Sequence, residues 1–470
     1  MTRRELLTRT SNGFGMAALA GILRGAEAGN TEKNPLAPKA PPLPAKAKSV
    51  IFLFMHGGVS HVDTFDPKPQ LTRYSGKPLS AELAKVIKTS FIHDPSKAIL
   101  RGSPWEFKPG GTCGTPVSDL YPNVRNMMDD ITVVRGCYSD QFDHAPAIYL
   151  RSTGHQLPGR PSLGSWVTYG LGTENQNLPA FVVMSDGSTK SGPPMYGAGF
   201  LPAVFQGTVF RSGESPILYL KNPDGVTGQV QRETLDFINK IDRIQERTRP
   251  NDSTLDARIA SYELAWRMQS SAPDAVDMNK ESEATKKLYG IGETVTDDFG
   301  RKCLLARRLV ERGVRFIELI SGTNVGADWD EAHTDLTGSH PRMAAKSDKP
   351  IAGLLQDLKA RGLLDSTLVV WGGEFGRTPL SQGDNGRDHH PYGFSTWMAG
   401  GGVKGGNVLG STDEFGVQAA EMRVDAHDVN ATILRLMGID HKQLTYLYQG
   451  RDMRLTDVKG DGEFTSKLIS

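Results

Sequence analysis

The chain has 470 residues, of which 38% are hydrophobic and 23% charged, and its formal net charge is +1 at pH 7. This size and composition are typical of a soluble globular protein with one large domain or two smaller ones. The balanced charge gives no electrostatic basis for binding nucleic acid or an anionic membrane surface. The three cysteines, Cys113, Cys137 and Cys303, are too few and too far apart for a zinc finger or a disulfide framework. Buried thiols are expected, although one disulfide could form.

The chain begins MTRRELLTRTSNGFGMAALAGILRGAEAGN, which has the layout of an export signal. Basic residues precede a short apolar stretch, and Ala26-Glu27-Ala28 follows as a small-residue cleavage site. The pair Arg3-Arg4 resembles the start of a twin-arginine signal, and the apolar stretch is too short to span a bilayer. We predict a twin-arginine-type signal peptide over residues 1–28, export by that machinery to the periplasm or another extracytoplasmic compartment, and no stable membrane span. The alternative is a frayed basic N-terminus.

Residues 29–48 are rich in Pro, Ala and Lys and are expected to form a linker. Strands are expected at Val50–Met55, Ile131–Val134, Phe181–Met184, Phe316–Ile320 and Leu368–Trp371, and one more in STWMAGGGVKGG. Helices are expected in IAGLLQDLKARGLL and DAHDVNATILRLMGI. This alternation predicts an α/β domain over residues 49–460, with a mixed, mainly parallel sheet that is covered by helices on both faces.

A helical insertion is expected at about residues 228–312. Leu255, Ile259, Tyr262 and Trp266 follow spacings of four, three and four, which places them on one helix face. Leu235, Ile238, Ile241 and Ile244 are expected to share a face in the same way. The insertion is expected to pack over the sheet, with its aromatic residues in the core rather than on a ligand.

Polar residues follow four of the predicted strands, where open α/β sheets bind their ligands. Each of these strand ends delivers a His with a nearby Asp or Glu. The main candidates, in chain order, are His56, Asp63, His144, Asp330, His333, Glu374, Asp388, His389 and His390. A single His is more often a satisfied core residue, but four such strand ends indicate a metal or polyvalent-anion site rather than an ordinary polar rim.

Mixed imidazole and carboxylate ligands suit zinc, manganese or iron. Asp330 and His333 are three residues apart, so a helical turn would place them on one side. Asp388, His389 and His390 cannot all point inward if the segment is extended, so Asp388 or His389 is expected to do so before His390. Arg377 and Arg387 could pair with a tetrahedral anion or could lie on the surface.

Several stretches resemble a bacterial, planctomycete-type family of unknown function, DUF1501. They are HGGVSHVDTFDPKP, YGAGFLPAVFQGTVFR, LDARIASYELAWRMQ, CLLARRLVERGVRFIEL, GGEFGRTP and GRDHHPYGFSTWMAGGGVKGG. The chain also resembles, more distantly, the alkaline phosphatase and sulfatase superfamily. That resemblance implies a two-metal hydrolytic site with a nucleophile at the start of a helix that ends in Thr-Gly. His144 stands in the nucleophile's place in HAPAIYLRSTGH, so sulfatase chemistry through a formylglycine is not supported.

The resemblance implies an exported metal-dependent hydrolase that acts on phosphate or sulfate esters, with a small-molecule or glycan ester as substrate. The expected metal is divalent: zinc, calcium or manganese. The expected ligands are His56, Asp63, Asp330, His333, Glu374, Asp388, His389 and His390. His144 is expected to be nucleophile, base or ligand, with Arg377 and Arg387 on the substrate; Ser60, Ser139 and Thr153 are alternative nucleophiles. The alternative functions are an inactive surface scaffold for sulfated or phosphorylated glycans, and an oxidative or isomerase activity at an iron site.

Overall fold

The structure is a computed structural model. It describes residues 34–469 apart from 79, 86–93, 95–96, 186, 214–215, 218–219, 221, 223, 249–252, 323–327 and 461. The predicted signal peptide and the first part of the predicted linker lie outside the described residues. Within the described ranges, no helix is both long enough and apolar enough to cross a membrane.

One sheet of eight strands forms the centre of the fold, in the order β12-β4-β11-β8-β1-β7-β5-β6. β11 pairs antiparallel with both β4 and β8, and every other neighbouring pair is parallel. The strands are β1 (Ser49–Met55), β4 (Ile131–Cys137), β5 (Phe181–Ser185), β6 (Thr208–Phe210), β7 (Phe316–Ser321), β8 (Thr367–Gly372), β11 (Phe394–Ala399) and β12 (Asn407–Leu409). The mixed, mainly parallel α/β fold class predicted from the sequence is confirmed.

The central strand β1 shows why these sequences form strands. All seven residues of SVIFLFM are buried, as expected of a strand with helices over both faces. Because side chains alternate along a strand, Ile51 and Leu53 enter one hydrophobic core while Phe52 and Phe54 enter the other.

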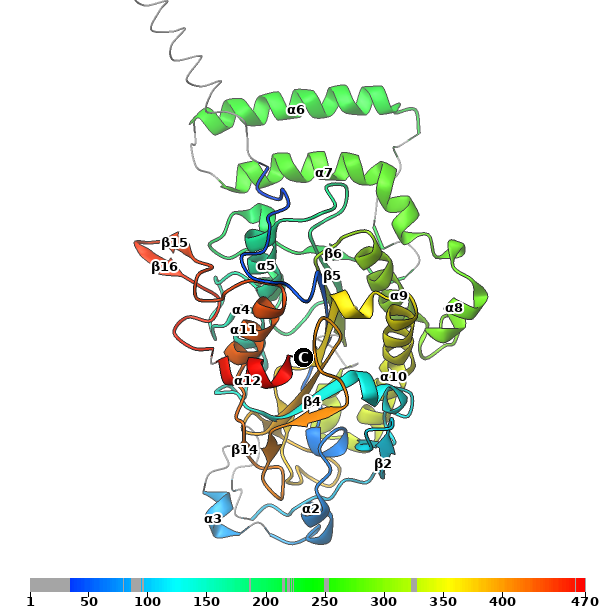
Figure 1. Cartoon of the computed structure of the whole chain (residues 1–470), viewed down its shortest axis with the longest axis vertical. Coiled ribbons are helices and arrows are strands. Elements are labelled where there is room, and N and C mark those ends of the chain that lie inside the picture. The colour runs from blue at the N-terminus through cyan, green and yellow to red at the C-terminus, as the bar shows by residue number, and fades with distance from the viewer. Residues whose placement is uncertain are drawn as a thin grey trace, which may run out of the picture.

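Helices cover both faces of the sheet, and in Figure 1 they appear on its left and right. One group comprises α4 (His144–Thr153), α5 (Leu163–Leu171), α11 (Ala426–Leu436) and α12 (Gly462–Leu468), and the other comprises α9 (Asp297–Glu311) and α10 (Leu336–Ala360). Helix α11 begins with a capping box: the side chain of Asp425 accepts the backbone N–H of Asp428, and the side chain of Asp428 accepts the backbone N–H of Asp425. The predicted late helices are both present, and α10 begins fifteen residues before the expected Ile351.

Between β6 and β7 the chain is largely helical, with α6 (Gly228–Thr248), α7 (Ser253–Val276) and α8 (Glu283–Leu288) before α9. Figure 1 shows α6 and α7 side by side at one end of the molecule, with α6 outermost. The expectation that Leu235 and Ile244 share a face is wrong, since Leu235 is partly buried and Ile244 is 62% exposed. Nine residues at about 100° each turn through roughly 900°, which is half a turn from the starting face.

Among the described residues, the remaining α-helices and strands are short. They are α2 (Pro69–Arg73), α3 (Ala81–Ala84), and four two-stranded sheets: β2 (Phe107–Gly110) with β3 (Thr115–Ser118), β9 (Gly376–Arg377) with β10 (His389–His390), β13 (Ser411–Thr412) with β14 (Ala419–Glu421), and β15 (Tyr446–Tyr448) with β16 (Arg451–Met453). All three cysteines are free thiols; Cys137 and Cys303 are buried as expected, whereas Cys113 is exposed.

Candidate metal centre

The candidate site lies at the carboxyl edge of the sheet, where five parallel strands end. The residues that follow β1, β4, β5, β7 and β8 include, in that order, His56, His144, Lys190, Asp330 and Glu374. β11 runs antiparallel, so it begins where its neighbours end. The segment just before β11, which contains His389, is therefore brought to the same edge.

Asp330 is the centre of a cluster of nitrogen atoms. Its Oδ1 lies 2.9 Å from Nε2 of His144, 3.1 Å from Nε2 of His333 and 3.0 Å from Nε2 of His389. Burial alone would raise the pKa of Asp330, but hydrogen bonds from these three rings hold that pKa well below its usual range. The carboxylate is therefore ionised and attracts positive charge from several sides.

His144 is the first residue of α4, and a carboxylate faces each of its ring nitrogens. Nδ1 lies 2.7 Å from Oε1 of the fully buried Glu374, and Nε2 faces Asp330. Burial opposes a charge on this ring, but the two carboxylates outweigh it and raise the pKa of His144. Because Nδ1–H donates to Glu374, Nε2 is the nitrogen left to bind a proton or another cation inside the cluster.

His333 belongs to the short 3-10 helix η6 (Trp329–His333), and its orientation is set in the same way. Its Nδ1–H donates to Oε1 of Gln382 at 2.6 Å, so Nε2 is the ring nitrogen that faces the cluster. That Nε2 lies 2.9 Å from Nε2 of His389. Burial lowers the pKa of His389 to about 2, so this ring is neutral near pH 7.

The donor set fits a divalent cation. Two overlapping groups have ligand atoms within 4.8 Å of one another: His144, Asp330 and His389, and then His333, Asp388 and His389. Two atoms that each bind one ion at about 2.0–2.2 Å lie at most about 4.4 Å apart, and the distances of 2.9–3.1 Å around Asp330 and His389 satisfy this limit. Each group, with two imidazole nitrogens and one carboxylate oxygen, is an arrangement that a shared cation would stabilise.

A lysine that the sequence did not single out also reaches this cluster. Nζ of Lys190 forms an ion pair with Asp330 and lies 3.3 Å from Oδ2 of Asp328 and 3.2 Å from Nε2 of His144. The Lys190 side chain is 15% exposed. It is therefore a cation at the rim of the site that a solute could reach.

His56 is held by protein groups on both sides of its ring. Its Nε2 accepts the backbone N–H of Lys190 at 3.0 Å, and its Nδ1 faces Oδ2 of Asp328 at 3.4 Å. The ring therefore supports the Lys190 loop, and its Nε2 lone pair is used by that loop rather than by a cation beside Asp330. Oε1 of Glu374 also accepts the backbone N–H of Gly57 at 2.9 Å, whereas its buried Oε2 has no hydrogen-bond partner among the described residues.

Asp63 and both arginines lie in a buried layer beside the cluster. Nε and Nη2 of Arg387 donate to the two oxygens of Asp63 at 2.7 and 3.1 Å, and both side chains are fully buried. Arg377 donates to the backbone carbonyls of Gly57 and Gly58 and, at 2.7 Å, to Asp330. The guanidinium groups of both arginines thus bind groups of the protein itself, and Arg377 also holds Asp330 in place.

His390 points away from its neighbour His389, as adjacent residues in an extended strand do. Its Nε2–H donates to the carbonyl of Val417, and its ring stacks on His61 at a centroid distance of 6.1 Å. Ser60 donates to Asp63 and Thr153 to the carbonyl of Tyr149, so both hydroxyls are engaged.

Two residues of the site, Lys190 and Gln382, are absent from the sequence-based candidates. Lys190 follows the predicted strand at Phe181–Met184, and a search of every strand end for any charged residue would have included it. Gln382 lies in a Gly-rich loop with no local pattern to mark it, and its role depends on a contact with His333, 49 residues away.

The fold and the cluster together define an α/β protein with candidate metal-ligand groups at the carboxyl edge of a mainly parallel sheet. The chain belongs to the family described as "Protein of unknown function (DUF1501)", whose model matches residues 47–468. No curated protein matches the chain.

Solved structures that resemble this one include the PsFucS1 sulfatase from Pseudoalteromonas sp., with 13% identity, coverage of 90% of this chain and 72% of that one, and a TM-score of 0.39. The lipoteichoic acid synthase LtaP from Listeria monocytogenes has 9% identity, coverage of 89% and 78%, and a TM-score of 0.36. The phosphonate monoester hydrolase SpPMH from Silicibacter pomeroyi has 13% identity, coverage of 73% of each chain, and a TM-score of 0.34. Each TM-score is below 0.5, so the chemistry proposed below rests on the side chains of this chain.

Proposed function

We propose that this protein is a metal-dependent hydrolase of phosphate or sulfate esters. The observation that supports the proposal is the convergence of the His144, His333 and His389 imidazoles on the carboxylate of Asp330. His144, Asp330 and His389 would hold a divalent ion, and His333 and Asp388 form a second group of candidate ligands with His389. When bound, such an ion acts as a Lewis acid on an ester oxygen and lowers the pKa of a bound water toward about 7.

In this proposal Glu374 and Gln382 are positioning residues. Each accepts the Nδ1–H of one ring, His144 or His333, and so presents the Nε2 lone pair to the cluster. Carboxylate and amide partners of this kind fix the tautomer and orientation of ligating histidines. His144 is then a ligand rather than the nucleophile or base that its place in the sequence suggested.

Lys190 would bind a negatively charged oxygen of the ester. Its ammonium group is at the rim of the cluster and is partly exposed. The guanidinium groups of Arg377 and Arg387 are fully buried and donate to carbonyls and carboxylates of the protein. A lysine ammonium is a compact charge that can turn from Asp328 and Asp330 toward an entering anion. We assign the substrate contact to Lys190 and structural roles to both arginines.

The test uses the full chain after chelation and reconstitution with zinc, manganese or calcium. Metal content is measured by mass spectrometry, and turnover is measured with an aryl phosphate, an aryl phosphodiester and an aryl sulfate. His389→Ala is expected to lose both metal and turnover. Its matched control is His390→Ala, an adjacent and equally buried histidine outside the cluster, which is expected to keep its metal.

Wild-type protein that binds none of the three ions after reconstitution would overturn the proposal. A protein that binds metal and sulfated glycans but turns over no ester would support the inactive scaffold instead. Turnover that persists in metal-free His389→Ala would assign the activity to another site.

The proposal includes export. It rests on Arg3-Arg4 and the short apolar stretch that follows. Changing both arginines to lysine is expected to leave the chain in the cytoplasm of a bacterial host, as measured by cell fractionation. Export of the double variant at the wild-type level would contradict a twin-arginine signal.

A further inference from the structure

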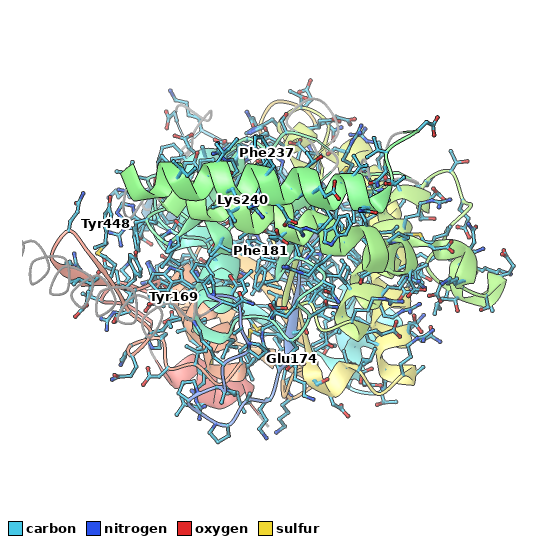
Figure 2. All side chains as sticks on the ribbon, turned by 90° about the horizontal axis from the view of Figure 1, so that it is seen from above. Tyr169, Glu174, Phe181, Phe237, Lys240 and Tyr448 are labelled. Carbon is cyan, nitrogen blue, oxygen red and sulfur yellow. The ribbon has the colours of Figure 1, made fainter. Side chains whose placement is uncertain are left out.

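Helix α6 exposes apolar side chains on its outer face. Val230 is 49% exposed, Phe237 62%, Ile241 40% and Ile244 62%. Figure 2 looks down on this helix, and Phe237 and Lys240 are labelled on it at the outside of the molecule. At about 100° per residue, the four apolar side chains fall within an arc of roughly 60°, and we call this set the α6 stripe.

The inner face of α6 mixes apolar and polar side chains, with Leu235 and Ile238 partly buried beside a set of ion pairs. Arg232 pairs with Glu263 of α7 at 2.7 Å, Asn239 donates to the same Glu263, and the buried Asp242 pairs with Arg258. A helix that packed only against its own domain would keep its apolar residues inward and its charges outward, whereas α6 also carries four apolar side chains on its outer face. The distribution on α6 therefore indicates a second apolar surface beyond the outer face.

The spacing of the α6 stripe is that of a coiled-coil seam. Val230, Phe237 and Ile244 are seven residues apart, and Ile241 lies four after Phe237 and three before Ile244. Thr234 fills the remaining seam position between Val230 and Phe237. At 21 residues, α6 is long enough to pair along this seam with another helix.

The charges beside the seam select the partner and its direction. Glu233 and Lys240 are both exposed and lie on the same flank of the stripe, one heptad apart. In an antiparallel pair related by a twofold axis, this flank meets its own copy. Glu233 then lies opposite Lys240 of the partner subunit, and the contact occurs twice by symmetry. A parallel pair would not bring these two charges together.

We propose that the α6 stripe is a self-association surface, through which two copies of this chain form an antiparallel dimer. The seam covers little more than two heptads, which is small for a stable interface. The dimer is therefore expected to be weak and dependent on concentration, and it is independent of the chemistry at the sheet edge.

Sedimentation equilibrium of the full chain, over about 1–200 μM, tests this proposal. Wild type is expected to shift from monomer to dimer across this range. Phe237→Glu is expected to raise the dissociation constant at least about tenfold. Val458→Glu is the matched control, since Val458 is 79% exposed and lies outside α6, and it is expected to dimerise as wild type does.

A charge exchange tests the antiparallel direction. Glu233→Lys alone and Lys240→Glu alone are each expected to weaken the dimer, because each places like charges opposite one another. The double variant restores both pairs and is expected to recover wild-type association. A wild-type chain that stays monomeric at the highest concentration would overturn the proposal, as would a dimer insensitive to Phe237→Glu or a double variant weaker than both single variants.

Discussion

Replacing Asp63 by asparagine separates the structural role of this residue from a role in metal binding. The sequence makes Asp63 a candidate ligand, but the structure places its two oxygens on Nε and Nη2 of Arg387, at 2.7 and 3.1 Å. Both side chains are fully buried. The asparagine keeps the shape of the side chain and loses the charge that compensates Arg387.

The expected loss of stability follows from that burial. Removing one partner of a buried ion pair leaves the other charge uncompensated, which costs about 3–5 kcal/mol. At an unfolding entropy of roughly 2.1 cal/mol/K per residue, a chain of 470 residues loses about 1 °C of melting temperature for each kcal/mol. Asp63→Asn is therefore expected to melt about 3–5 °C below wild type.

The assay combines calorimetry with metal analysis, and Asp330→Asn is the comparison variant. Asp63→Asn is expected to keep the wild-type metal content below its melting transition, since Asp63 does not face the cluster. Asp330→Asn is expected to lose the metal, because its Oδ1 is the oxygen on which three imidazoles converge. If Asp63→Asn loses its metal and melts at the wild-type temperature, the assignment of Asp63 to a structural pair is refuted.

Three further outcomes are expected. Gln382→Ala removes the acceptor of the His333 Nδ1–H and should weaken metal binding about 10–100-fold in a chelator competition. An unchanged metal affinity would show that Gln382 does not fix the tautomer of His333. Burial raises the pKa of Glu318 to about 8 from an ordinary 4.5. Between these two pH values the folded chain holds a proton that the unfolded chain has released. The free energy of unfolding therefore falls by about 1.4 kcal/mol for each unit that the pH rises. Glu318→Gln should flatten this dependence in denaturant titrations, and a wild-type stability that rises over this range would contradict the direction. Gly154 ends α4 at a φ of 68°, and a Cβ there would collide with the carbonyl oxygen of Leu455, so Gly154→Ala should cost at least about 2 kcal/mol in the same titrations; a smaller loss would show that the backbone shifts freely.

The strands are predictable because they are fully buried and therefore read as continuous apolar runs. Val50–Met55 and Phe316–Ile320 both lie within the observed strands β1 and β7. In a parallel sheet the carboxyl ends meet at one edge, so the sequence alone places His144, Asp330 and Glu374 near one another. The alternation of side chains in an extended segment also gives a physical reason for separating His389 from His390.

The partner of each buried charge could not be predicted, because it is set by tertiary contacts. Asp63 and Arg387 are 324 residues apart, and nothing local to either residue marks the pair. Lys190 lies in a short polar loop, where a lysine is usually solvated, and only the approach of Asp330 gives it a place in the site. A repeated spacing of three residues, as from Leu235 to Ile244, predicts one face only over a short stretch, because each step falls about 60° short of a full turn.

The antiparallel strand β11 has a consequence for how the chain matures during synthesis. A chain that leaves the ribosome from its amino terminus already contains β4 and β8 before residues 394–399 exist. Because β11 lies between β4 and β8 in the sheet, those two strands take their final spacing only after it inserts. His144 and Glu374, which follow these strands, lie 2.7 Å apart in the folded chain and are expected to meet only at that step. An ion held by this edge would thus bind only to chains whose folding is complete, and metal content would report the folded fraction directly.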